Sequence, residues 1–170
     1  MKFRMIFAAA VLALGTTAMA TTLKENTQEF RVEGEFNPET ANGTDFQVGL
    51  TYGLFVADNI EIGGHITYHD NNSSSLFSAG PFAELNFDIG GEMVPFLGLS
   101  VDYAHGDAGA ENHDALAFTG YGGVKYFLSE NVAIQARLAL DLATDKIYAK
   151  SNKAESTDIT VDLGMSFYIP

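Results

Sequence analysis

The chain has no cysteine among its 170 residues, and it carries nine lysines and arginines against 22 aspartates and glutamates. The missing cysteine excludes a disulfide framework, a zinc–cysteine site and thiol chemistry. The shortage of positive charge argues against nucleic acid as a partner, because nucleic acids are bound by basic patches. No Pro-rich or Gly/Ser-rich linker divides the chain, and its length is that of about one domain.

Residues 1–20 have the pattern of a cleavable signal peptide. A basic start, MKFR, is followed by the apolar run MIFAAAVLALG at 5–15 and by the small-x-small site AMA that ends at Ala20. The apolar run is too short for a transmembrane helix, which needs about 20 apolar residues, and no later segment approaches that length. We therefore predict export with cleavage near Ala20. Cleavage removes two of the nine basic residues and no acid, so the mature domain, residues 21–170, has a net charge of −15.

Apolar and polar residues alternate in eight segments of the mature chain. In VAIQARLALDL at 132–142, Leu138 and Leu140 point one way while Arg137 and Asp141 point the other, a period of two that is typical of a strand. Read as a helix, the same apolar residues share no single face. The other seven segments are FRVEGEF at 30–36, DFQVGLTYGLF at 45–55, IEIGGHITYH at 60–69, LFSAGPFAELNF at 76–87, VPFLGLSVDY at 94–103, LAFTGYGGVKYF at 116–127 and DITVDLGMSFYI at 158–169.

Two of these segments depart from the pattern. Phe82 and Phe96 sit on the polar face of their segments. Pro81 lies within a run, where a proline normally restricts a strand to the edge of a sheet.

The connections between the segments alternate in length. Tight turns rich in Asp, Asn and Gly lie at 57–59, 88–92 and 129–131, and longer polar loops are predicted at 37–43, 70–75, 104–114 and 143–156. This order predicts an all-β fold, an eight-stranded antiparallel up-and-down barrel, with the loops at one end and the turns at the other.

The apolar face of such a barrel meets either a soluble core or membrane lipid. Three features favour a transmembrane barrel. Several segments alternate over 9–11 residues, the length a tilted strand needs to cross a bilayer. The polar face mixes both charge signs, as a narrow lumen requires. Aromatic residues gather near the strand ends, as in the girdles of membrane barrels: Phe55, Phe87, Tyr126 and Phe127 at the turn end, Tyr68 and Tyr103 at the loop end.

The charged residues of the polar face are the candidate site. They form either a structural network or a pore lining, and they are Arg31, Glu33, Glu61, Glu84, Asp102, Lys125, Arg137, Asp141 and Asp162. Opposite charges in a narrow lumen are expected to pair, so we expect Arg137 and Lys125 to contact Glu33, Glu61, Glu84 or Asp141. Glycines on the same face leave room for these long side chains.

The mature chain resembles the small outer-membrane barrels of the OmpA/OmpX and opacity-protein type. The resemblance is carried by the signal peptide, the eight alternating segments, YGLFVADNIEIGGHITY, MVPFLGLSVDYAHG and YGGVKYFLSENVAIQARLAL. It implies a bacterial outer-membrane location, outer-membrane lipid as surroundings and the outer-membrane assembly machinery as a partner. One departure is the C-terminus, which is Pro170 where such barrels usually end on an aromatic residue.

The histidines and serines do not predict a metal or catalytic site. His65 and His69 share the lumen face of one strand, and His105 and His113 flank an acidic loop, but polar lumen and loop residues explain all four without a metal. Ser100 and Ser166 have no histidine near them in sequence. We therefore expect no enzyme activity and no cofactor.

The function expected from the sequence is that of a small, non-enzymatic outer-membrane barrel with a largely plugged polar lumen. It would serve envelope integrity, or bind a surface ligand through its four polar loops. One alternative is a narrow cation-preferring channel for small solutes, and another is a soluble periplasmic ligand-binding barrel.

Overall fold

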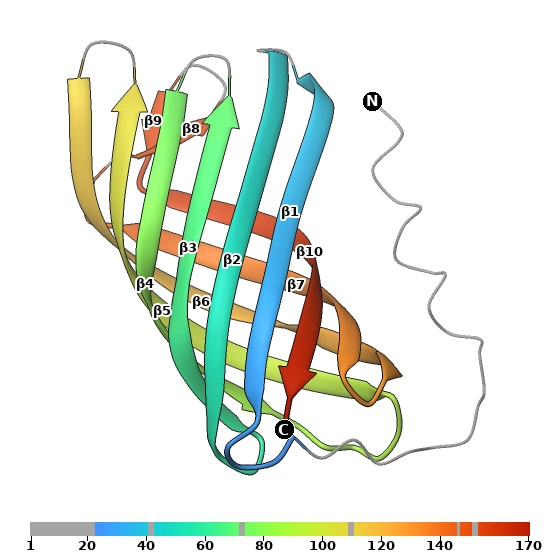
Figure 1. The fold of residues 1–170 in the computed structure, drawn as a ribbon. Coiled ribbons are helices and arrows are strands. Elements are labelled where there is room, and N and C mark those ends of the chain that lie inside the picture. The colour runs from blue at the N-terminus through green and yellow to red at the C-terminus, as the bar shows by residue number, and fades with distance from the viewer. Residues whose placement is uncertain (1–22, 41–42, 72–73, 109–110, 146, 151–152) are drawn as a thin grey trace.

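The computed structural model describes residues 23–40, 43–71, 74–108, 111–145, 147–150 and 153–170. Eight long strands form one closed barrel (Figure 1). They are β1 (Gln28–Thr40), β2 (Gly43–Ala57), β3 (Ile60–Asn71), β4 (Ser74–Asn86), β5 (Met93–Ala108), β6 (Glu111–Ser129), β7 (Val132–Ala143) and β10 (Thr157–Ile169). The short strands β8 (Tyr148–Lys150) and β9 (Lys153–Glu155) pair with each other outside the barrel wall.

Each long strand is antiparallel to the strand that follows it in the barrel, and β1 pairs with β10 to close the wall. Closure aligns Phe30 with Phe167 and Glu33 with Gly164. A closed wall satisfies the backbone hydrogen bonds of every strand from its neighbours and leaves no free edge. The predicted eight-stranded up-and-down barrel is confirmed. Within the described ranges there is also no helix that is both long and apolar enough to span a membrane.

The strands extend further at the loop end than the sequence predicts. β1 runs to Thr40 and β2 starts at Gly43, β3 and β4 are separated only by 72–73, and β5 and β6 only by 109–110. The loop ranges 37–43, 70–75 and 104–114 are therefore mostly strand, and only 143–156 remains a longer excursion. The polar residues of these ranges show where the apolar outer face of the barrel ends. The hydrogen-bond ladder continues past that point, because strand backbones pair whatever side chains they carry.

Pro81 does not place its strand at an edge. β4 is internal and pairs with both β3 and β5, and Pro81 lies opposite Gly64. The β4–β5 ladder skips Gly80 and Pro81 and resumes at Phe82, opposite Ser100. The missing N–H of proline is thus accommodated by a local gap in one ladder.

The barrel is apolar outside and charged inside. Leu99 on the outer face is 69% exposed and Ile159 is 67% exposed, whereas Glu29 and Lys125 inside are fully buried. Soluble proteins show the reverse, because they bury apolar side chains and expose charged ones. The arrangement fits a hydrocarbon environment around the barrel and contradicts the soluble periplasmic alternative.

Two residues assigned to the aromatic girdles face the lumen instead. Phe55 and Phe127 are buried and cluster with Leu23, Val94, Ala133 and Tyr168 at the turn end. Side chains along a strand point alternately outward and inward, and Phe55 and Phe127 occupy inward positions of their strands. Phe87 (39% exposed), Tyr68 and Tyr103 lie on the outer face as expected, and Tyr126 is half-buried with its hydroxyl bonded to Glu92.

Residues 23–27 precede β1 and lie against the turn between β2 and β3. The amide of Asn59 donates to the carbonyl of Leu23 at 2.7 Å, and that of Asn26 donates to the carbonyl of Phe55 at 2.7 Å. Asp58 in the turn accepts from the Glu25 amide at 3.0 Å and pairs with Lys24 at 3.2 Å. The segment is thereby fixed to the β2–β3 turn.

We expect the Asp58 carboxyl to titrate below its ordinary value. The hydrogen bond from the Glu25 amide and then the Lys24 ammonium lower the pKa of Asp58 below 3.8. A lowered pKa means that this contact stabilises the folded chain above the unfolded pKa and ceases to do so as pH falls through the folded pKa. An NMR titration of the Asp58 carboxyl carbon should give a midpoint below 3.8, and Lys24→Gln should raise it. A midpoint at or above 3.8 in the unsubstituted chain would contradict the contact.

Candidate functional site: the charged lumen

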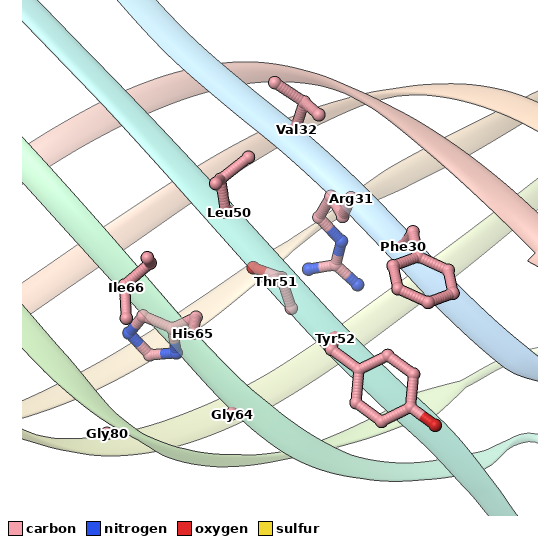
Figure 2. Close-up of a pocket in the computed structure, with 10 residues that line it drawn as sticks. All are labelled: Phe30, Arg31, Val32, Leu50, Thr51, Tyr52, Gly64, His65, Ile66 and Gly80. Carbon is pink, nitrogen blue, oxygen red and sulfur yellow. The ribbon is translucent and has the colours of Figure 1, made fainter.

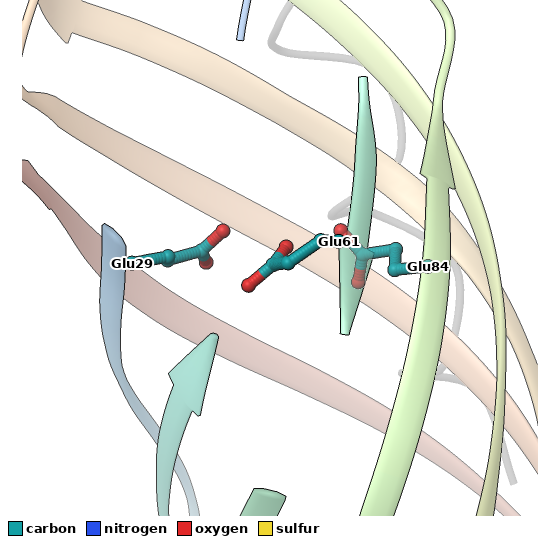
Figure 3. A group of neighbouring side chains, drawn as sticks. All are labelled: Glu29, Glu61 and Glu84. Carbon is teal, nitrogen blue, oxygen red and sulfur yellow. The ribbon is translucent and has the colours of Figure 1, made fainter. Parts of the chain in front are cut away.

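The lumen layer nearest the turn end is organised around Lys125 of β6. Its ammonium lies 2.8 Å from Glu29 Oε2, 2.7 Å from Glu84 Oε1 and 3.6 Å from Glu61 Oε2. These carboxylates come from β1, β4 and β3 and converge on one point (Figure 3). One lysine therefore links strands that lie on different sides of the barrel.

Arg31 of β1 contacts the same three carboxylates. Its Nε donates to Glu29 Oε1 at 2.7 Å, and its Nη2 lies 3.2 Å from Glu84 Oε2 and 3.7 Å from Glu61 Oε2. The Ser166 hydroxyl also donates to Glu29 at 2.7 Å. Three carboxyl groups thus face two cations, so the buried cluster contains one more acidic group than basic groups.

Aromatic rings surround the two cations. Lys125 Nζ lies 5.4 Å from the ring centroid of Phe96 and 5.7 Å from that of Tyr168. The Arg31 guanidinium lies 5.9 Å from the ring of Phe82. Within about 6 Å the face of an aromatic ring attracts a cation, so these rings offset part of the cost of removing the charges from water. This explains why Phe82 and Phe96 occupy the polar face.

A second layer, toward the loop end, is organised around Arg137 of β7. Its Nη2 lies 2.8 Å from Asp162 and 3.3 Å from Glu33, and its guanidinium lies 5.1 Å from the ring of Tyr121. The side-chain amide of Gln135 donates to Glu33 at 2.7 Å. Here too one cation joins strands on both sides of the β1–β10 closure.

A third group of lumen side chains is paired without arginine or lysine. His65 Nε2 lies 2.8 Å from Asp102 Oδ1, and the Ser100 hydroxyl donates to Asp102 Oδ2 at 2.8 Å. The Thr119 hydroxyl donates to Asp141 at 2.6 Å. Asp141 therefore has a neutral partner, and it is not in the ion pair with Arg137 or Lys125 that was considered for it.

The excess carboxylate belongs to Glu61. Both of its oxygens are buried without a hydrogen-bond donor, although Lys125 and Arg31 lie within ion-pair distance. Glu61→Gln is expected to leave the free energy of unfolding unchanged or to raise it, by up to about 1 kcal/mol, because two carboxylates then face two cations. Glu84→Gln is the matched control and should destabilise by about 1–3 kcal/mol, since Glu84 holds Lys125 at 2.7 Å. Urea titrations that ranked the two variants in the opposite order would contradict this assignment.

Each of the nine charged residues predicted from the sequence faces the lumen, but sequence reasoning missed some of their partners. Glu29 contacts both cations of the first layer, yet it was not among the nine candidates. The alternation of polar and apolar residues indicates its position, because it places Glu29 on the same face as Arg31 and Glu33. Gln135 was also missed, because an amide is a less obvious member of a charge network.

The structure describes the side chains of three of the four histidines. His65 points into the lumen, whereas His105 lies on the outside at the loop end, where its Nδ1 is 2.7 Å from Asp114. His69 is on the lumen side of β3, and His113 lies outside the residues whose side chains are described. Oxygens of Glu29, Glu61 and Glu84 lie within 4.8 Å of one another, close enough for one ion. Lys125 and Arg31 already supply positive charge to all three of these carboxylates.

A shallow depression marks the outer wall over β1, β2 and β3 (Figure 2). Gly64 has no side chain there, and the apolar residues around it are Phe30, Val32, Leu50, Tyr52 and Ile66; Arg31, Thr51, His65 and Gly80 complete the lining. This surface faces outward and is almost wholly apolar, so it suits a lipid chain better than a polar ligand.

The fold is that of small outer-membrane barrels. The N-terminal β-barrel domain of OprF from Pseudomonas aeruginosa matches 85% of this chain and 98% of its own at 14% identity, with a TM-score of 0.64. Neisserial surface protein A matches 89% of this chain and 99% of its own at 19% identity, with a TM-score of 0.56. Ail from Yersinia pestis, determined in a phospholipid bilayer nanodisc, matches 85% of this chain and its whole own chain at 11% identity, with a TM-score of 0.53. No protein-family model and no curated sequence matches the chain.

Proposed function

We propose that the chain is a small integral outer-membrane barrel whose lumen is closed by its own side chains. The observation that carries this is the inversion of the barrel: apolar side chains cover the outside, and Lys125, Arg31 and their carboxylates fill the inside at less than 3% exposure. An eight-stranded barrel has an interior that side chains can fill. The likeness in fold to barrels of the bacterial outer membrane supports the same location.

The orientation follows the rule for such barrels. Short turns face the periplasm and the opposite ends face the outside, so the turns after β2, β4 and β6 are periplasmic. Outer-membrane lipid then contacts the apolar wall, and insertion depends on the outer-membrane assembly machinery. The phenyl ring of Phe167 and the buried Tyr168 precede the non-aromatic Pro170, and we propose that they provide the aromatic end of the last strand.

The working surface is then the loop end. With no path through the lumen, the role is envelope integrity or the binding of a surface ligand by the strand ends and connections within 37–43, 70–75, 104–114 and 143–156. We propose no enzymatic role. Ser100 donates its hydroxyl proton toward Asp102, and His65 contacts the other oxygen of Asp102 and not the serine, so the serine–histidine contact of an activated nucleophile is not made here.

A cation-preferring channel is the second candidate, and the charge balance of the lumen favours it. Among the side chains that the structure describes, the lumen-facing carboxyl groups of Glu29, Glu33, Glu61, Glu84, Asp102, Asp141, Asp158 and Asp162 outnumber the cations Arg31, Lys125 and Arg137. An acidic path would favour cations over anions.

Single-channel recording from the refolded mature chain in a planar bilayer separates the two candidates. Heat-dependent gel mobility first establishes that the barrel has formed. A closed lumen predicts silence. Discrete cation-selective steps that are lost in Glu61→Gln and Glu84→Gln would overturn the closed lumen and establish the channel.

A further inference from the structure

We propose that Leu23–Thr27 is a lid that closes the periplasmic end of the lumen, with the Leu23 side chain as its plug. This function is independent of the role of the loops and belongs to residues near the start of the mature chain. Leu23 precedes the first strand, yet its side chain is only 3% exposed.

The place where Leu23 is buried is the mouth of the barrel. It belongs to one apolar cluster with Phe55, Val94, Phe127, Ala133 and Tyr168. These residues come from β2, β5, β6, β7 and β10, so the cluster spans the lumen and is not confined to one wall. The rings of Phe127 and Tyr168 lie 5.2 Å apart, and those of Phe55 and Tyr168 lie 6.4 Å apart.

Aromatic rings connect the lid to the charged layer. Tyr168 and Phe55 belong to the cluster under Leu23, and their rings lie 5.7 Å and 5.9 Å from Lys125 Nζ. Water that reached the lumen from this side would meet Lys125 next. A leucine in the mouth therefore keeps the ion pairs in a dry environment, where they are strongest.

The lid is attached on one side. Apart from one internal bond, in which the Thr27 amide donates to the Lys24 carbonyl, the hydrogen bonds made by the backbone of Leu23–Thr27 and by the Lys24 side chain go to residues 55–59 at the β2–β3 turn. The Lys24–Asp58 pair is exposed, at 64% and 54%. The segment is thus hinged at one turn, while its apolar side chain reaches across the mouth.

The lack of cysteine in the chain allows a direct test. Ala133→Cys places a thiol under Leu23, at a position with 0% exposure, and Glu130→Cys places one in the exposed β6–β7 turn as the matched control. The refolded mature chain is treated with a water-soluble maleimide, with and without Leu23→Asn. The expected result is that Ala133→Cys reacts at least tenfold faster once Leu23 is replaced, while Glu130→Cys reacts equally fast in both backgrounds.

Two results would overturn the lid. In one, Ala133→Cys reacts as fast as Glu130→Cys while Leu23 is intact, so the segment does not close the mouth. In the other, Ala133→Cys stays inert after replacement of Leu23, so the strand residues alone close it. Heat-dependent gel mobility verifies the fold of each variant, and Leu23→Ala serves in the same comparison if Leu23→Asn does not refold. Labelling and conductance are independent readouts, so the lid and the closed lumen stand or fall separately.

Discussion

Lys125→Met is expected to lower the free energy of unfolding by about 3–5 kcal/mol, the usual effect of removing one partner from a buried ion pair. The lysine is fully buried and lies within 3.6 Å of Glu29, Glu61 and Glu84. Without it, Arg31 alone faces three buried carboxylates. Methionine has a similar length, so the decrease in the free energy of unfolding measures removal of the charge and not the creation of a cavity. The measurement is urea unfolding in lipid vesicles, followed by the heat-dependent gel shift.

Lys24→Met is the matched control for this variant. Lys24 makes an ion pair with Asp58 at 3.2 Å, but both side chains are more than half exposed. Exposed pairs contribute little, typically less than about 1 kcal/mol. If both lysine variants unfolded at the same urea concentration as the unsubstituted chain, the central role of Lys125 would be wrong.

Gly63→Ala is expected to destabilise the barrel by about 1–3 kcal/mol or to prevent its refolding, as overpacking does in well-packed interiors. A methyl group at Gly63 would lie 2.1 Å from the carbonyl oxygen of Tyr52, 2.7 Å from the ring of Phe82 and 2.8 Å from the Cα of Gly53. Two of these neighbours are backbone atoms of the adjoining strand, which cannot rotate away.

The next residue provides the control. A methyl group at Gly64 would point outward, and its nearest neighbour would be the carbonyl oxygen of Gly80 at 3.7 Å. Gly64→Ala should therefore change the free energy of unfolding by less than about 0.5 kcal/mol, as surface substitutions do. Similar unfolding curves for Gly63→Ala and Gly64→Ala would contradict the inward and outward assignment of these two glycines.

The direction of most side chains was predictable from the sequence, because strand alternation is a local property. Arg137 and Asp141 in 132–142 alternate with leucines, and the structure places both on the lumen side. Phe55 and Phe127 show that the alternation should have been trusted over the expectation of an aromatic girdle. The same alternation places Glu29 on the lumen face with Arg31 and Glu33, although Glu29 was not among the candidate charged residues.

The pairing of charges was not predictable to the same degree. Lys125 and Glu29 are 96 residues apart in sequence, and their contact exists only because β1 closes the barrel against β10. Which acid meets which base depends on that register and on the tilt of each strand. The burial of Leu23 was beyond the alternating pattern as well, since a residue outside every strand carries no periodic signal.

The most direct test determines which face of the barrel meets lipid. The chain has no tryptophan, so the fluorescence of one introduced indole can be observed by itself. Leu138→Trp places one indole on the outer wall, where leucine is 56% exposed, and Phe96→Trp places one in the lumen, where phenylalanine is 1% exposed. The fluorescence of each is measured in vesicles of lipid with brominated acyl chains. If the apolar face meets lipid, Leu138→Trp is quenched strongly and Phe96→Trp weakly. Equal quenching, or stronger quenching of Phe96→Trp, would contradict it.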